Sequence, residues 1–358
     1  MKTRDYVLIN AQTLTDSQTV TKDLTGGLKI MELRCRYSAT NGATSNTLGK
    51  LNAKITKLEV VDGSDVLHSL SGQEEQALNF YRHGVLPFQQ LNSKAAGVCI
   101  EEFIINFGRF RGDRECYLDT GRFKNAQLRL TNAFTVSATA GIATGTGALT
   151  VIAKVIEDGA PACRGFIMSK EQKSWTTVAS GDEDTDLPLD FPYQSIMVKD
   201  LLTTVEPDVS LTNLKLIMDA GRFIPFDLSA AIVLADNMAR FGRARQRLNF
   251  LNDTAVTWLS DLYARAIGWM GPIGGTAKGG CSTVTAEQLV AYMTTGDTAS
   301  LFLNVEGYAP HSCLYLPFGD GSQIDDFLPV QGANELTLRA SQGGASAAAA
   351  VVTNQLRQ

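Results

Sequence analysis

The chain has 358 residues, of which 44% are hydrophobic and 19% are charged, and its formal net charge at pH 7 is −5. This composition is typical of a globular protein with a large core, and the length favours two domains. The negative charge gives no overall attraction to nucleic acid, and no apolar run approaches the ~20 residues that span a bilayer. The N-terminus has neither a long apolar run nor a small-residue cleavage site, so we expect no signal peptide.

The first half of the chain is predicted to be rich in strands. Residues 29–38, "KIMELRCRYS", alternate apolar and polar side chains, and residues 53–71 predict two strands around the turn-forming pair Asp62-Gly63. A helix is expected over 71–84, with Ser71 and Glu74 as a capping box and Gly84 at its end. Together with the later strand-like runs, this predicts about eight strands and one helix in ~150 residues, which indicates a sandwich or barrel.

The pattern breaks near residues 157–165, "EDGAPACRG", and we place the domain boundary there, which gives domains 1–160 and 161–358. The acidic segment 180–192, "SGDEDTDLPLDFP", is expected to be a solvated loop. A site for Ca²⁺ is the alternative, but the segment lacks the EF-hand order and its closing Glu.

The second half repeats the first. The segment "SLSGQEEQALNFYRHG" (69–84) aligns with "DLSAAIVLADNMARFG" (227–242), and the flanking hairpins and later strands align in the same order. Similar composition explains one match but not an ordered series, so we predict a tandem duplication of one β-sandwich domain.

The second copy contains an insertion over about 243–312, which adds 53 residues because the offset between the copies grows from 158 to 211. Long loops on a rigid sandwich often carry surface function. Since the first copy lacks this segment, we expect a deletion of roughly Trp258 to Thr295 to leave the second sandwich able to fold.

The sequence offers no recognisable catalytic or metal-binding motif. The three histidines, His68, His83 and His311, lack metal-site spacing, and Cys313 near His311 is interpreted as an ordinary strand-end residue. There is no G-x-S-x-G elbow, and "GATSNTLGK" (42–50) does not match a phosphate loop. We therefore predict no catalytic residue, no cofactor, no metal and no small-molecule substrate. The six cysteines have no C-x-x-C pair and are expected to be buried thiols, which suits assembly in a reducing compartment; they are Cys35, Cys99, Cys116, Cys163, Cys281 and Cys313.

Two basic clusters and an RGD tripeptide are further candidates for surface contacts. The tripeptide at 111–113 is interpreted as a polar turn, with receptor binding as the alternative. The basic clusters suit phosphate groups of nucleic acid or lipid, but ion pairing with Asp113, Glu115 and Asp119 or between subunits is favoured. The clusters comprise Arg109, Arg111, Arg114, Arg122 and Lys124, and then Arg240, Arg243, Arg245 and Arg247.

Two tandem eight-stranded jelly-roll sandwiches, each with a helix inside, resemble the double jelly-roll major capsid proteins of icosahedral viruses, the group of adenovirus hexons and membrane-containing phages. The resemblance rests on the hairpin-and-helix units 58–84 and 214–242 and on the late strands 117–134 and 327–341. It covers most of the chain through arrangement and not through a diagnostic motif.

The resemblance implies a structural role. Three chains would form a homotrimer with six similar lobes, which tiles a hexagonal lattice beside neighbouring capsomers and other capsid proteins such as a vertex protein. It implies synthesis in the host cytoplasm and a final place in the virion. An N-terminal segment with Lys2, Arg4 and Arg34 nearby is a candidate inward-facing arm toward an internal membrane or the genome, and the Arg240–Arg247 run is a second candidate contact surface.

Two other classes remain open at this point. A carbohydrate-binding or carbohydrate-cleaving jelly roll uses aromatic side chains over a concave sheet, and this chain has three tryptophans, Trp175, Trp258 and Trp269. A secreted single-sandwich trimer would need an export signal and gives no reason for a second copy.

Overall fold

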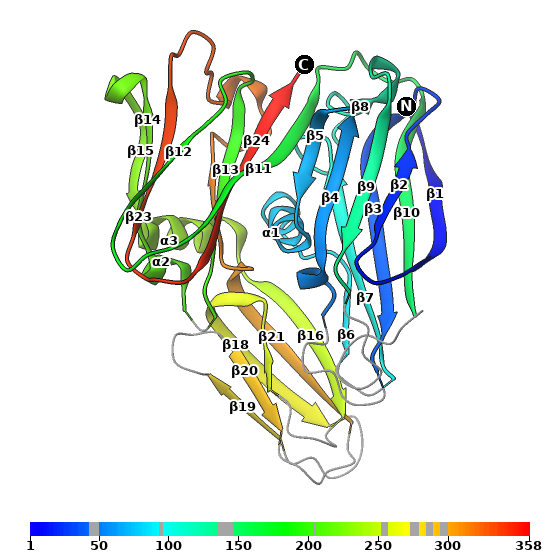
Figure 1. Ribbon diagram of the computed structural model, residues 1–358, viewed down its shortest axis with the longest axis vertical. Coiled ribbons are helices and arrows are strands. Elements are labelled where there is room, and N and C mark those ends of the chain that lie inside the picture. Colours follow the sequence, from blue (N-terminus) through cyan, green and yellow to red (C-terminus); the bar gives the residue numbers. More distant parts are fainter. Residues whose placement is uncertain are drawn as a thin grey trace.

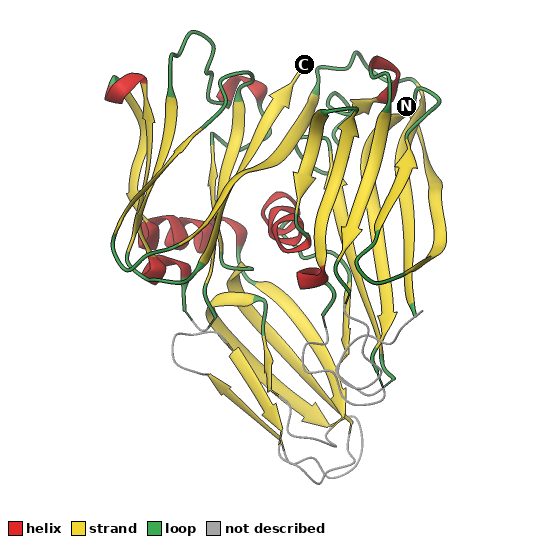
Figure 2. Ribbon diagram, in the orientation of Figure 1, coloured by secondary structure: helices red, strands yellow, loops and turns green. Residues whose placement is uncertain are grey.

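Two β-sandwiches stand side by side in the computed structural model, with one helix between them and a smaller group of strands projecting below (Figure 1). Strands account for most of the chain, and the helices are few and short (Figure 2). The structure describes residues 1–42, 50–92, 96–134, 146–203, 205–251, 257–272, 279–283, 289–293 and 300–358.

The first sandwich has two facing four-stranded layers, as predicted. One layer has the order β1 (Lys2–Leu14), β10 (Gly147–Asp158), β3 (Lys29–Thr40) and β7 (Val98–Asn106), and β6 (Gln89–Asn92) continues it. The other layer has the order β2 (Thr19–Asp23), β9 (Ala126–Asn132), β4 (Ile55–Asp62) and β5 (Asp65–Leu70). A short strand, β8 (Leu118–Asp119), pairs with β3.

The second sandwich repeats this order strand for strand. One layer runs β11 (Phe166–Thr176), β24 (Ala348–Arg357), β13 (Tyr193–Leu201) and β22 (Cys313–Pro317). The other runs β12 (Gly181–Asp186), β23 (Leu336–Gln342), β14 (Leu211–Met218) and β15 (Phe223–Ser229). The predicted all-β fold of two tandem eight-stranded jelly rolls is therefore confirmed.

The two copies agree in register as well as in strand order. The pairing of β1 with β10 shifts between Val7 and Ile9, and the pairing of β11 with β24 shifts between Glu171 and Lys173, 164 positions later. A bulge adds one residue to one strand of a pair, so a repeated bulge is a specific sign of common origin.

The helix of each copy occupies the same place. Helix α1 (Gly72–His83) and helix α3 (Ala230–Phe241) lie 158 positions apart, and serines Ser71 and Ser229 cap their N-termini. The predicted capping box between Ser71 and Glu74 is present in α1, and Gly84 ends that helix at a φ of 73°. Glycine takes this left-handed conformation without strain. A one-turn helix also precedes the equivalent strand in each copy: a 3-10 turn over Asn52–Lys54 before β4, and α2 (Pro207–Ser210) before β14.

A buried asparagine ties each helix to the neighbouring strand. Asn79 of α1 donates to the carbonyl of Ile104 at 2.7 Å and accepts from its N–H at 2.9 Å. Asn237 of α3 makes the same pair of hydrogen bonds to Tyr315, both at 2.7 Å. In both copies the amide side chain thus pairs with the backbone N–H and C=O of one residue of the neighbouring strand.

The described residues of the insertion lie mostly in strands and do not form one long loop. It contains β16 (Ala244–Leu251), β17 (Thr257–Leu259), β18 (Leu262–Pro272), β19 (Gly279–Thr283), β20 (Leu289–Met293) and β21 (Ser300–Pro310). Strand β16 pairs in parallel with β6 of the first sandwich, and β21 and β18 extend that sheet. The group projects from the end of the molecule opposite the N- and C-termini, and we call it the tower (Figure 1).

The tower is anchored more deeply than the sequence indicated. Asp261, Leu262 and Ala264 are buried, and Leu262 packs in a core cluster shared by α1, β16 and β21. We therefore revise the expectation that the second sandwich folds after a deletion from Trp258 to Thr295, because that deletion would remove these core residues.

The acidic segment also differs from its prediction. Residues 181–186 form strand β12, paired with β23, and are not a loop. Arg339 on β23 binds Asp184 at 2.8 Å and lies 3.8 Å from Asp182. Cross-strand charge pairing therefore supports a strand whose composition disfavours one.

None of the described helices is long and apolar enough to cross a membrane.

Candidate interaction surfaces

The junction between the two sandwiches shows how one copy recognises the other. Strand β5 of the first copy pairs in parallel with β11 of the second, with Ser69 opposite Lys170. At the end of this contact Arg357 binds Asp65 through two hydrogen bonds of 3.0 and 2.6 Å. The sheets of the two copies are thus joined edge to edge.

Helix α1 fills the junction. The ring of Tyr81 stacks on that of Tyr315, with ring centroids 5.0 Å apart. Arg82 donates to the hydroxyl of Ser169 at 3.2 Å and to the side-chain oxygen of Asn354 at 3.0 Å. Both acceptors belong to the second copy, so this partly buried guanidinium joins the two sandwiches.

Two side chains of β11 also enter the core of the first sandwich. Phe166 lies against Phe107, with ring centroids 6.2 Å apart, and Met168 belongs to the same buried cluster. The first sandwich is therefore closed on this side by a strand from its duplicate.

A buried polar network lies where the tower joins both sandwiches. Lys50 binds Asp261 at 2.6 Å, and Gln76 donates to Glu101 at 2.8 Å while its own oxygen lies 2.9 Å from the ring of His311. Burial raises the pKa of Glu101 to about 7, assisted by the nearby charge of Asp261. Burial also lowers the pKa of His311 to about 4.

The outer edges of the molecule are the counterparts of the joined edges. Within the described residues, β1 pairs with β10 alone and β15 with β14 alone. Their counterparts in the duplication, β11 and β5, pair with each other. Large apolar side chains are exposed at both outer edges: Tyr6 and Val7 on β1, Phe223 and Ile224 on β15, and Ile232 on α3.

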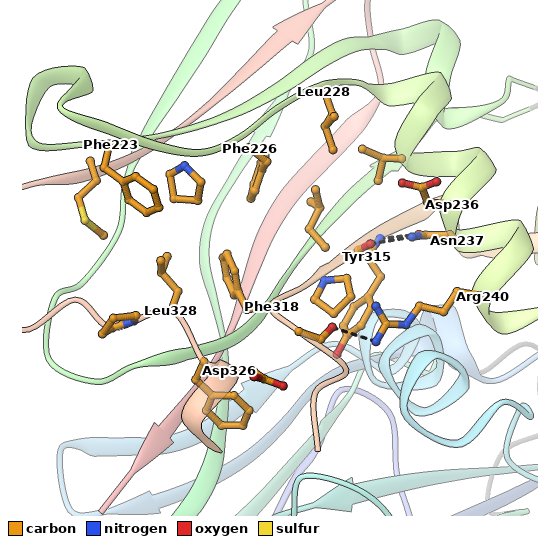
Figure 3. Close-up of a pocket in the computed structure, with 18 of the residues that line it drawn as sticks. Phe223, Phe226, Leu228, Asp236, Asn237, Arg240, Tyr315, Phe318, Asp326 and Leu328 are labelled. Carbon is orange, nitrogen blue, oxygen red and sulfur yellow. Dashed lines mark hydrogen bonds between the residues drawn. The ribbon is translucent and has the colours of Figure 1, made fainter. Parts of the chain in front are cut away.

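A hollow of about 720 Å³ opens beside β15, between that strand, α3 and the chain after β22 (Figure 3). Aromatic and aliphatic side chains line most of it, and Arg240 donates to the carbonyl of Gly319 at its rim. Carboxylates add negative charge. The apolar lining includes Phe223, Phe226, Leu228, Phe318 and Leu328, and the acids are Asp236, Asp325 and Asp326.

The structure does not bring the predicted titratable candidates into one site. His68 and Glu75 form a buried pair at 2.8 Å in the first sandwich, and His311 lies in the network at the base of the tower. Cys313 is a buried free thiol near His311, and burial raises its pKa. Among the described residues, no group of three His, Cys, Asp or Glu side chains could hold a metal ion.

The basic clusters are largely committed to contacts within the chain. Arg109 binds Asp113 at 2.7 Å and Glu115 at 2.8 Å, as the favoured interpretation predicts. Asp113 of the RGD tripeptide is thereby buried, which supports the turn interpretation. In the second cluster, Arg245 binds Glu306 at 2.8 Å.

The expected N-terminal arm is a strand. Residues 2–14 are part of β1, in which Arg4 pairs with Glu157 at 2.7 Å and Asp5 pairs with Arg34 at 2.8 Å. Edge strands with exposed side chains on both faces lack the alternation that marks a strand in sequence, which explains the error.

The tryptophans do not form one aromatic platform in the described structure. Trp175 packs against the core of the second sandwich, whereas Trp269 is half exposed on the tower strand β18. The side chain of Trp258 lies outside the described residues.

Comparisons with known proteins agree with this architecture. No protein-family model and no curated protein matches the sequence. Solved structures do match. The STIV MCP has a TM-score of 0.61 at 11% identity, and the match covers 99% of this chain and 97% of that one. The major capsid protein P2 from bacteriophage PM2 has a TM-score of 0.54 at 12% identity, covering 100% and 98%. A structure of the PBCV-1 virus capsid has a TM-score of 0.57 at 8% identity, covering 99% and 93%.

These matches extend over nearly the whole length of each chain. The chain therefore has the double jelly-roll fold, which is the fold of these viral major capsid proteins.

Sequence reasoning missed the exposed apolar residues of the two outer edges. A signal for them exists in the duplication itself. Val7 occupies the position of Glu171, and Ile232 that of Glu74, so each pair is charged in one copy and apolar in the other.

Proposed function

We propose that the chain is a major capsid protein that assembles with copies of itself into the shell of an icosahedral virus, with a structural and not a catalytic role. The observation that carries the proposal is the pairing of β5 with β11 inside the chain, while their duplicates β15 and β1 lie at the outer edges. Because β15 is the counterpart of β5 and β1 is the counterpart of β11, β15 of one chain can pair with β1 of the next as β5 pairs with β11 inside the chain.

Such a head-to-tail contact produces either a closed ring or an open filament. Closure after three chains gives a homotrimer with six similar sandwiches, and a six-lobed unit fits the sixfold positions of a hexagonal lattice. The likeness in fold to viral capsid proteins supports the closed ring.

The positions of the tower and the termini at opposite ends of the chain suggest how the trimer would be oriented in the shell. The tower projects at one end, and both termini lie at the other (Figure 1). In a ring of parallel sandwiches all towers would share one face, which we assign to the outside of the virion. The terminal face would then be directed toward the interior, where an internal membrane or the genome would be met. Neighbouring capsomers and a vertex protein would contact the sides of the trimer. The chain itself would be synthesised in the host cytoplasm before assembly.

The mass of the purified protein by light scattering tests the proposal. A homotrimer has three times the chain mass of 38.6 kDa. A stable monomer that is retained on a sugar column would contradict the proposal and would favour the carbohydrate-binding class, for which half-exposed Trp269 would be the first residue to substitute.

A further inference from the structure

We propose that β1 of one chain pairs with β15 of a second copy in the register that the internal junction dictates, with Tyr6 opposite Asp227, Val7 against Ile232, and Arg4 at the hollow beside β15. This inference rests on the proposed function and adds the residues and register of the contact between chains.

The duplication supplies the register. Ser69 of β5 corresponds to Asp227 of β15, 158 positions later, and Lys170 of β11 corresponds to Tyr6 of β1, 164 positions earlier. Because Ser69 lies opposite Lys170 inside the chain, the same junction between two chains places Asp227 opposite Tyr6. A shift by one residue would turn every side chain of the strand to the opposite face.

The side chains at these positions suit a contact that is buried on assembly. Inside the chain, Glu74 and Glu171 line one hollow together with Lys199. The counterparts of the two acids are Ile232 and Val7, whose exposed fractions are 50% and 51%. Two aliphatic side chains at facing positions gain from mutual burial, and each is unfavourable where it is left in water.

The hollow adds a second match under the same correspondence. Met168 of β11 enters the core of the first sandwich, and its counterpart on β1 is Arg4. The hollow that corresponds to this place in the second sandwich combines aromatic rings with Asp236, Asp325 and Asp326. A guanidinium stacks on aromatic faces and binds carboxylates, so Arg4, which in the single chain forms an exposed ion pair with Glu157, is suited to this environment on assembly.

A charge pair follows from the same correspondence. Arg82 donates to Ser169 across the internal junction. The counterparts of these residues are Arg240 at the rim of the hollow and Asp5 on β1, which carry opposite charges and in the single chain contact Gly319 and Arg34 respectively. Their approach between two chains is therefore favourable, although both are near the surface and the contribution is small.

The edges themselves also favour this partner. An exposed edge strand with apolar side chains is a template for uncontrolled pairing, and proteins usually protect such edges. Here β1 and β15 carry exposed apolar residues, and a second copy provides the complementary edge for each of them.

Disulfide trapping tests the register. The double variant Val7→Cys/Ile232→Cys should form chains linked in threes under mild oxidation, seen as a covalent trimer on a non-reducing gel. Each single variant controls for the native thiols. The matched variant Asn10→Cys/Ile232→Cys should remain unlinked, because Asn10 lies three residues farther along β1, which is ~10 Å in a strand, and a disulfide requires Cα atoms within ~7 Å.

Light scattering of the same samples after reduction distinguishes a failure of the register from a failure of the proposed function. A trimer that is linked through position 10 and not through position 7 would overturn the register while leaving the proposed function intact. A monomer for the unmodified chain would overturn both.

A pair of oppositely charged substitutions at the same two positions tests the contact if the cysteine variants fail to assemble. Val7→Asp should weaken trimer formation at least tenfold, and Ile232→Lys in the same chain should restore it. Val178→Asp is the control, since Val178 is also 51% exposed but lies in the connection between β11 and β12 and not on β1 or β15. A Val7→Asp variant that assembles as tightly as the control would contradict the proposal.

Discussion

Replacing Asn237 by alanine removes both hydrogen bonds that connect helix α3 to strand β22. The side chain is buried, and its two 2.7 Å bonds satisfy the N–H and the carbonyl of Tyr315. Alanine leaves both backbone groups without a partner, and each such buried group costs about 1–3 kcal/mol. We therefore expect the free energy of unfolding to fall by about 3 kcal/mol.

The equivalent substitution in the first copy is an internal comparison. Asn79 is fully buried and also donates to Glu75 at 2.9 Å, so Asn79→Ala should cost at least as much as Asn237→Ala. The assay is equilibrium chemical denaturation followed by tryptophan fluorescence, with Asp236→Ala as the neighbouring helix control. A loss below about 1 kcal/mol at Asn237 would refute the reasoning, because it would mean that the backbone of Tyr315 finds water instead.

Three further predictions follow from buried charge, backbone geometry and the tower. Burial raises the pKa of Glu101 to about 7, so the folded chain keeps a proton that the unfolded chain releases, and stability falls as pH rises from about 4.5 to about 7. Glu101→Gln should remove this loss, so the free energy of unfolding of the variant, relative to that of the unmodified chain, should rise by up to about 3 kcal/mol between pH 5 and pH 8. Chemical denaturation of both proteins at the two pH values measures this. A difference between the two proteins that is the same at both pH values would contradict the buried titration. Gly165→Ala should prevent stable folding because its Cβ would lie 2.3 Å from the carbonyl oxygen of Arg357, whereas Gly63→Ala, with open space around it, should cost only about 1 kcal/mol; equal thermal midpoints would refute this. Replacing residues 273–300 by an Asn-Gly turn should leave a folded chain, since Pro272 pairs with Leu301 at the adjacent strand ends and two residues then close the hairpin; aggregation of this variant would show that the tip of the tower is part of the core.

The duplication could be predicted because its signals are local. Ser71 with Glu74, Gly84 and the Asp62-Gly63 turn each fix one short element, and the constant offset of 158 aligns the second helix with the first. Asn79 and Asn237 appear in that alignment as identical residues, but their role at the strand backbone required the structure.

The interaction surfaces could not be predicted because they depend on pairings between distant segments. The junction of β6 with β16 joins residues 157 positions apart, and no periodicity in either segment indicates a partner. The same holds for β12, whose acidic residues are stabilised by Arg339 on another strand. The exposed residues Val7 and Ile232 become informative only when the paired edges of the other copy are known.

A cryo-electron microscopy map of the purified oligomer tests the central claim most directly. We expect a closed ring of three chains and six sandwiches, with all towers on one face, all termini on the other, and β1 beside β15 at every contact between chains. Single chains, an open filament, or a ring in which β1 and β15 both face solvent would contradict it.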